Sequence, residues 1–226
     1  MKLRINGFER DIEFNDNNVN VMYIENTSLF THVIELINNK LNGFEDNEIV
    51  LLDNEDNEIN FEKNAFFLLD YFNIDYNSKK ILKNIYDRIA VNIENNQDEK
   101  VYQLSKELTN LLISEINELQ FEFVMKDSIE IQDLLKLYNL KIDGSSYTDV
   151  LDRVELVINL LAEFKIANLL ILPNIKSFLD DEKLVELYKY SLYNNIDLFI
   201  IERHQSNKLT YEHSILIDEN FNEIQL

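Results

Sequence analysis

Acidic side chains gather in the middle of the chain. Glu115, Glu118 and Glu122 stand at i, i+3 and i+7, a spacing that places three carboxylates on one face of a helix. The acidic residues of the next turn follow at once: Asp127, Glu130 and Asp133. Carboxylates that meet where two helices join repel one another unless a hard cation lies between them, and calcium accepts such oxygen ligands in flexible geometry. The cluster predicts a calcium site, and a solvated acidic face with an Asp127–Glu130 capping arrangement is the alternative.

Basic residues are few, but two short stretches hold three each. The segment NSKKILK contains Lys79, Lys80 and Lys83. The first residues of the chain contain a second group: Lys2, Arg4 and Arg10. Ammonium and guanidinium groups gathered in this way can bind phosphates, although each group alone is too small to hold DNA without oligomerisation. Ordinary helix and hairpin surface is the alternative interpretation of both stretches.

The position where an NTPase would bind phosphate lacks the residues for that chemistry. A phosphate loop lies between the first buried parallel strand and the next helix, which here reads VMYIENTSLFTHV. Thr27 and Ser28 are present, but neither a glycine nor a lysine is, so no backbone nest and no ammonium can hold the phosphates. A later strand, FIIERH, places Glu202, Arg203 and His204 at a strand end, where ligands bind in open α/β sheets. We expect Arg203 to pair with Glu202 or another neighbour; the alternatives are a catalytic role or a place on a partner-facing surface. We therefore expect no nucleotide and no enzymatic activity.

Composition excludes several classes of protein. The chain has 226 residues, no cysteine, and 42 acidic against 21 basic residues, for a formal net charge of −21. Disulfides and thiolate metal sites are excluded, and the charge argues against a surface that wraps nucleic acid. No apolar run approaches about 18 residues and no signal-like N-terminus is present, so we expect a cytoplasmic bacterial protein away from membranes.

The order of the predicted elements indicates an α/β domain interrupted by helices. VNVMYIEN, EIVLLD, LLIL and DLFII read as strands, and the last two are apolar throughout, as in parallel sheets buried on both faces. NFEKNAFFLLDYFNI reads as a short apolar helix, and TDVLDRVELVINLLAEF as an amphipathic one. We predict a discontinuous α/β head domain, residues 1–76 and 141–226, with an inserted α-helical extension, residues 77–140.

The predicted extension contains three helices. Two long amphipathic helices, at residues 77–96 and 98–123, are expected to form a hairpin through the polar turn NNQDE. A short helix, IEIQDLLKLY, is expected to start at a Ser128 cap and to end at Asn139 in the left-handed conformation.

Three stretches carry a resemblance to a known family. SKKILKNIYDRIA, NELQFEFVMKDSIEIQDLLKLYNLKID and LLILPNIKSFLDDEKLVELYKYSLYNNIDLFIIERH resemble the ring-forming protein of subtype II-A CRISPR systems, which takes part in spacer acquisition. The similarity runs nearly end to end and rests on length, order and spacing of elements rather than on one diagnostic motif.

The resemblance implies a degenerate P-loop-ATPase-like head and a non-enzymatic function. It implies a homotetrameric ring that binds calcium and holds the ends of double-stranded DNA, with other CRISPR adaptation and effector proteins of the same locus as partners. The calcium ligands that it implies are Glu115, Glu118, Glu122, Asp127, Glu130 and Asp133. No fixed motif of the family specifies its DNA contacts, and the cations that we expect to contact DNA here are Lys63, Lys79, Lys80, Lys83 and Arg203. The alternative is an acidic protein–protein adaptor of the acquisition complex that contacts DNA only incidentally.

A ring would reconcile DNA binding with the negative charge of the chain. Four copies of a modest basic patch facing one hole create a local positive potential, while the outer surface remains acidic. Such a ring would contact phosphates and duplex shape rather than base sequence.

Overall fold

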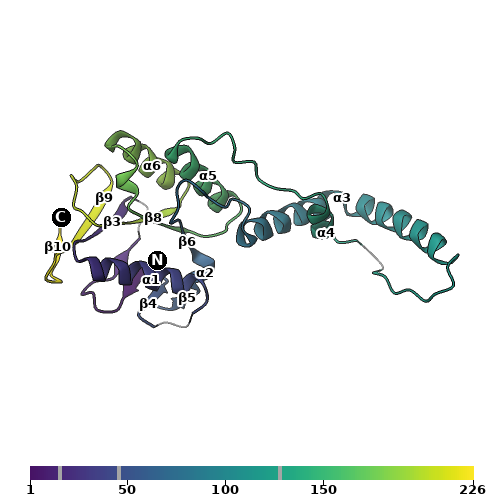
Figure 1. Cartoon of the computed structure of the whole chain (residues 1–226), viewed down its shortest axis with the longest axis horizontal. Helices are drawn as coiled ribbons and strands as arrows, with labels where there is room; N and C mark the ends of the chain where they lie inside the picture. The colour runs from purple at the N-terminus through teal and green to yellow at the C-terminus, as the bar shows by residue number, and fades with distance from the viewer. Residues whose placement is uncertain (15–16, 45–46, 127–128) are drawn as a thin grey trace. The chain divides into compact units, whose positions relative to one another are not determined.

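The computed structural model describes residues 1–14, 17–44, 47–126 and 129–226. The chain forms two compact units, the first made of Met1–Tyr76 and Gly144–Leu226, the second of Asn77–Asp143 (Figure 1). The first unit is an α/β domain, which confirms the predicted fold class. Within the described residues, every helix falls short of what a membrane span requires in length and apolar character.

A six-stranded sheet forms the centre of the first unit, in the spatial order β10-β9-β3-β8-β7-β6. Its strands are β3 (Val19–Ile24), β6 (Ala65–Phe67), β7 (Leu169–Pro173), β8 (Asp197–Glu202), β9 (Glu212–Ile217) and β10 (Glu223–Gln225). All neighbours pair in parallel except β10, which is antiparallel to β9. Numbered along the chain, the parallel strands lie in the order 5-1-4-3-2.

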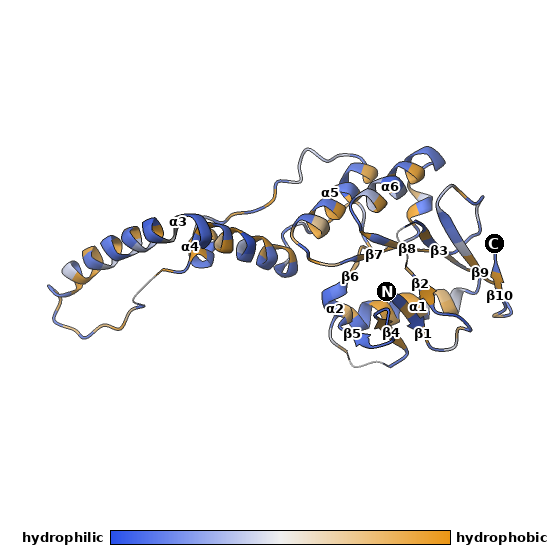
Figure 2. Ribbon diagram, turned by 180° about the vertical axis from the view of Figure 1, so that it is seen from behind, coloured by the Kyte–Doolittle hydropathy of each residue, from blue (hydrophilic) through white to orange (hydrophobic). Residues whose placement is uncertain are grey.

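Helices cover both faces of this sheet. Helices α5 (Val150–Glu163) and α6 (Asp181–Tyr193) lie on one side, and α1 (Thr27–Leu41) lies on the other (Figures 1 and 2). Each begins at a side-chain cap of the expected type, with Asn26 before α1, Asp149 before α5 and Asp180 before α6. The strands β3 and β7 are buried along their whole length, as a sheet covered on both faces requires.

A smaller antiparallel sheet packs with α1 on that second side. Its order is β2-β1-β4-β5, with β1 (Lys2–Ile5), β2 (Ile12–Glu13), β4 (Ile49–Leu52) and β5 (Glu58–Ile59). Side chains of β1 and β4 join Val33 and Ile37 of α1 and Phe199 and Ile201 of β8 in one apolar core. The small sheet and α1 therefore share one apolar core with this face of the main sheet.

The apolar stretch predicted as one helix, NFEKNAFFLLDYFNI, is a helix only in its first turn. Helix α2 (Phe61–Asn64) is followed directly by strand β6, in which Ala65 pairs with Leu169 and Phe67 with Ile171. The prediction was wrong because the stretch completes the sheet through a partner about a hundred residues away, and such pairing overrides local propensity.

One long helix dominates the second unit. Helix α3 (Lys79–Ile116) continues through NNQDE, so the predicted hairpin of two helices was wrong. The five residues include neither glycine nor proline, and polar residues alone do not stop a helix. Helix α4 (Ile131–Leu137) follows, and Asn139 has φ 52°, which confirms the predicted left-handed exit. Ser128 lies outside the described residues, and the structure caps α4 at Glu130.

Candidate functional site

The loop at the phosphate-binding position is short and is occupied by the protein itself. Between β3 and α1 only Glu25 and Asn26 intervene, and the Asn26 side chain accepts the backbone N–H of Leu29 at 3.0 Å. Arg203 donates from Nη1 to the carbonyl oxygen of Glu25 at 2.5 Å, and its guanidinium lies 6.0 Å from the ring centroid of Phe30. Arg203 therefore contacts this loop: of the partners expected for it, Glu202 or another neighbour, the structure shows the backbone of the neighbouring Glu25.

A buried polar cluster lies on the same sheet, made of Tyr23, Lys176, Tyr188, Glu202 and Glu212. Lys176 belongs to the short 3-10 helix η1 (Ile175–Ser177) that follows β7. Its ammonium lies 2.6 Å from a Glu212 carboxylate oxygen and 2.7 Å from the Tyr23 hydroxyl. The Tyr188 hydroxyl donates to the same Glu212 oxygen at 2.8 Å. The one buried ammonium of this cluster is thus held by an internal carboxylate.

Glu202 is the second carboxylate of the buried polar cluster. Its side chain accepts the backbone N–H of Lys176 at 2.9 Å, and the residue is 4% exposed. Burial raises the pKa of Glu202 to about 7; the Lys176 amide and ammonium counteract this shift, and the Glu212 carboxylate adds to it. Burial, together with the nearby Glu212, also raises the pKa of Tyr188 above its usual range. The sequence drew attention to Glu202 only as a charged residue at the end of the strand FIIERH, and no pattern indicated that Lys176, Tyr188 and Glu212 would join it.

The lysines predicted to bind DNA fall into two groups. Helix α3 begins with the sequence KKILK, so Lys79, Lys80 and Lys83 share its N-terminal end, and its first turn contains no acidic residue. Lys79 and Lys83 are exposed, and neither has a carboxylate partner within the described residues. Lys63 is exposed on α2 of the first unit, where Arg203 also lies. The α3 lysines therefore form the one group that the structure brings together within a single element.

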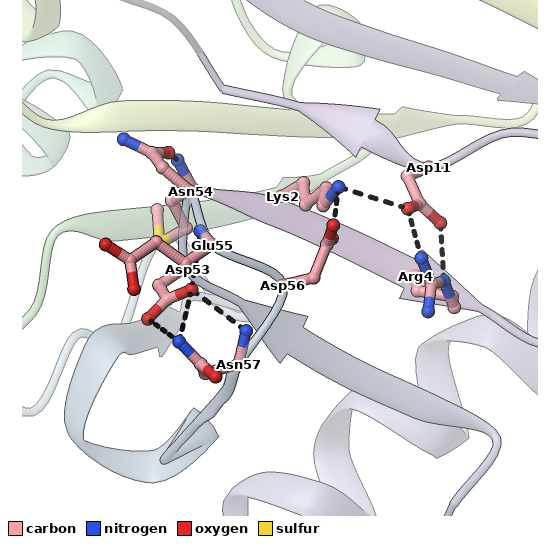
Figure 3. Close-up of polar contacts among 9 residues, drawn as sticks. Lys2, Arg4, Asp11, Asp53, Asn54, Glu55, Asp56 and Asn57 are labelled. Carbon is pink, nitrogen blue, oxygen red and sulfur yellow. Dashed lines mark hydrogen bonds and ion pairs between the residues drawn. The ribbon is translucent and has the colours of Figure 1, made fainter.

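The basic residues of the first strands are already neutralised (Figure 3). Arg4 donates two hydrogen bonds to the Asp11 carboxylate, at 2.8 and 2.7 Å, and Lys2 forms ion pairs with Asp11 and Asp56. The Arg4 guanidinium holds the pKa of Asp11 below its usual range. Arg10 donates to the Gln225 side chain at 3.2 Å. Two of the three cations are therefore paired with carboxylates, and Arg10 contacts a neutral amide.

The acidic residues predicted to bind calcium do not share one helix face. Helix α3 ends at Ile116, so Glu115 lies in its last turn while Glu118 and Glu122 lie beyond it. Glu130 caps α4 and Asp133 lies in its first turn, whereas Asp127 lies outside the described residues. Among the residues that the structure describes, no three acidic or histidine side chains gather closely enough to hold a metal. Their oxygen chemistry suits calcium, but their described positions do not form its site, so calcium binding stays a prediction.

Two lysines lie among these carboxylates instead. The Lys126 ammonium is 3.0 Å from Asp133 and 3.9 Å from Glu130, and Lys136 is 3.0 Å from the other Asp133 oxygen. Hydrogen bonds from the two ammonium groups lower the pKa of Asp133. All four side chains are at least 40% exposed, so these ion pairs are weak.

Comparisons with known proteins agree with the resemblance found in the sequence. The family model described as CRISPR-associated protein (Cas_Csn2) matches residues 44–221. The CRISPR-associated protein Csn2 of Enterococcus faecalis is 25% identical over 224 residues, which cover 98% of this chain and 97% of that protein. The crystal structure of Stu0660 of Streptococcus thermophilus has a similar fold, with a TM-score of 0.62 and 14% identity over 96% of this chain and 75% of that one. Because the family model spans most of the sequence, the chain belongs to the Cas_Csn2 family of CRISPR-associated proteins.

Proposed function

We propose that this CRISPR-associated adaptation protein binds double-stranded DNA ends as a homotetrameric ring and has no enzymatic activity. The observation that carries the proposal is the KKILK start of α3. Cations at a helix N-terminus oppose the helix dipole, so these lysines reduce rather than increase the stability of α3. Their positive potential adds to that of the helix end, and a phosphate backbone would be attracted by both.

The proposal of no enzymatic activity is supported by the loop after β3, where a P-loop protein would bind the phosphates of a nucleotide. Phosphate binding in a P-loop protein needs free backbone N–H groups and a free ammonium. Here Asn26 and Arg203 engage the loop backbone, and the Lys176 ammonium is paired with Glu212. The polar groups at this position therefore bind other groups of the protein rather than a phosphate.

Calcium is the proposed counter-ion of the acidic segment of the second unit. Its ligands would come from the carboxylates of Glu115, Glu118, Glu122, Asp127, Glu130 and Asp133. Bound calcium would reduce the repulsion among these side chains and so support assembly of a chain whose net charge is −21. Calcium binding would require these carboxylates to lie closer together than they do in the described structure.

A mobility-shift experiment tests DNA binding and end loading together. Linear and closed-circular duplexes of equal length are mixed with the protein at about 0.1 M salt, with calcium or with chelator. We expect binding to the linear duplex alone, stronger with calcium. The variant Lys79→Glu/Lys80→Glu/Lys83→Glu should bind at least about tenfold more weakly, since three phosphate contacts are reversed. The control Lys100→Glu/Lys106→Glu reverses two lysines of the same helix that lie away from its N-terminus.

A second candidate function is a protein–protein adaptor of the acquisition complex. The observation that favours it is the apolar surface of the second half of α3, where Tyr102 is 64%, Leu104 57% and Leu111 61% exposed. Exposed apolar patches of this kind mark protein contacts. Unchanged DNA affinity in the three-lysine variant would favour this adaptor, and equal binding to closed circles would exclude end loading.

A further inference from the structure

The buried polar cluster carries an unequal number of charges. It contains one ammonium, that of Lys176, and two carboxylates, those of Glu202 and Glu212. The side chains of Lys176 and Glu212 are 7% and 0% exposed, and Glu202 is 4% exposed as a residue. If both carboxylates are ionised, a net negative charge remains where water has almost no access, which is costly. One proton on Glu202 balances the cluster.

The groups around Glu202 come from every element packed against it. Tyr23 of β3 pairs with Glu202 in the strand register. Four further groups interact electrostatically with Glu202: Lys176 of η1, Glu212 of β9, Tyr188 of α6, and Tyr71, which follows β6. Lys176 is the only cation that acts on Glu202 from these described elements. Its backbone N–H, rather than its ammonium, is what Glu202 contacts in the structure.

We propose that Glu202 is a proton-sensitive switch: when it loses its proton to solvent, the Lys176 ammonium moves from Glu212 toward Glu202, and the η1 turn moves with it. The inference stands on geometry, because one lysine contributes its backbone to one carboxylate and its side chain to the other. A pKa of about 7 places the change of charge on Glu202 near neutral pH.

The turn that would move supports an aromatic surface. Phe178 follows η1 directly, is 45% exposed and lies 5.4 Å from the ring centroids of both Tyr71 and Phe72. The Tyr71 hydroxyl donates to the carbonyl oxygen of Pro173, at the end of the strand before η1. A displacement of η1 would therefore change how Phe178 and the 56% exposed Phe72 are presented at the surface. The switch belongs to the first unit and is independent of the DNA binding proposed for α3.

Nuclear magnetic resonance on the full chain tests this switch. The amide signals of Lys176, Ser177 and Phe178 are followed from about pH 5.5 to about pH 8.5 in the wild type and in Glu202→Gln, which fixes a neutral side chain. Glu219→Gln, at an exposed site of the same unit, is the control for loss of a carboxylate. His204→Gln is the second control, because His204 is an exposed imidazole two residues from Glu202 in the sequence.

The outcomes separate clearly. We expect one transition near pH 7 at all three amides in the wild type, in Glu219→Gln and in His204→Gln, and a flat response in Glu202→Gln. A flat response in the wild type would overturn the switch without reference to any variant. A transition that persists in Glu202→Gln but disappears in His204→Gln would assign the titration to the histidine and also overturn it.

Discussion

At the scale of single residues, the Lys176–Glu212 pair is a buried ion pair of the first unit and should be sensitive to substitution. Its charges lie 2.6 Å apart with side chains that are almost fully buried. Lys176→Met leaves the Glu212 carboxylate buried without a cation, which we expect to cost about 3–5 kcal/mol of unfolding free energy. Urea denaturation measures the loss. The control is Lys183→Met, because Lys183 and Asp149 are about 40% exposed and their pair should contribute only about 0–1 kcal/mol. Equal losses in the two variants would contradict the assigned role of burial.

The carboxyl of Glu202 makes a second prediction at this scale. Its folded pKa of about 7 lies above the ordinary 4.5, so the folded state binds this proton more tightly than the unfolded state does. The contribution of Glu202 to stability is therefore greatest below about pH 4.5, decreases as the pH rises to about 7, and stays low above it. Glutamine stays neutral at every pH, so the unfolding free energy of Glu202→Gln should rise relative to that of the wild type as the pH increases. Between pH 4 and pH 8 we expect this relative gain to reach up to about 3 kcal/mol. Denaturation of both proteins across this range checks the sign.

At the scale of elements, the continuity of α3 distinguishes one helix from a hairpin. Asn96 lies within α3 and donates from its side chain to the carbonyl oxygen of Asn92 at 2.7 Å. Asn96→Ala should raise the stability of the helix by about 0.5 kcal/mol, because alanine is the better helix former. Asn195→Ala is the matched control: Asn195 has φ 55°, and alanine in that conformation costs about 1 kcal/mol. Circular dichroism with thermal unfolding measures both changes, and a loss of helix in Asn96→Ala would indicate a turn there.

The elements also show how far the sequence could predict this molecule. The apolar runs LLILP and DLFII are strands as predicted, because burial on both faces leaves a continuous apolar signal. Strand β6 and the cluster around Lys176 were missed because both depend on partners distant in sequence: β6 on β7, and Lys176 on Glu212. The grouping of the α3 lysines was predicted because it is local in the sequence. The positions of Glu118 and Glu122 were predicted wrongly, because the helix expected to carry them ends at Ile116.

At the scale of the whole molecule, the proposed binding of DNA has to overcome the formal net charge of −21 that the chain itself carries. The mean charge repels DNA, so affinity has to come from the local group at Lys79, Lys80 and Lys83. A single copy offers three such ammonium groups, which limits the number of phosphates that it can neutralise. Repeating the group around a ring multiplies the contacts on one duplex without changing the net charge per chain. The dependence of DNA affinity on salt therefore reports the assembly state.

Counting phosphates turns this dependence into a prediction. Each neutralised phosphate contributes about −0.9 to the slope of log K against log salt, so one copy with three contacts gives about −3, and four copies on one duplex approach about −11. We expect the steeper slope for the wild type on a linear duplex, measured by fluorescence anisotropy between about 0.05 and 0.2 M salt. Lys79→Glu/Lys80→Glu/Lys83→Glu should flatten it, while Lys100→Glu/Lys106→Glu should not. A wild-type slope near −3 would mean that the α3 lysines of only one copy contact the duplex. If a ring placed all four lysine groups on the duplex, the counterions displaced by all four groups would be released and the slope would be steeper.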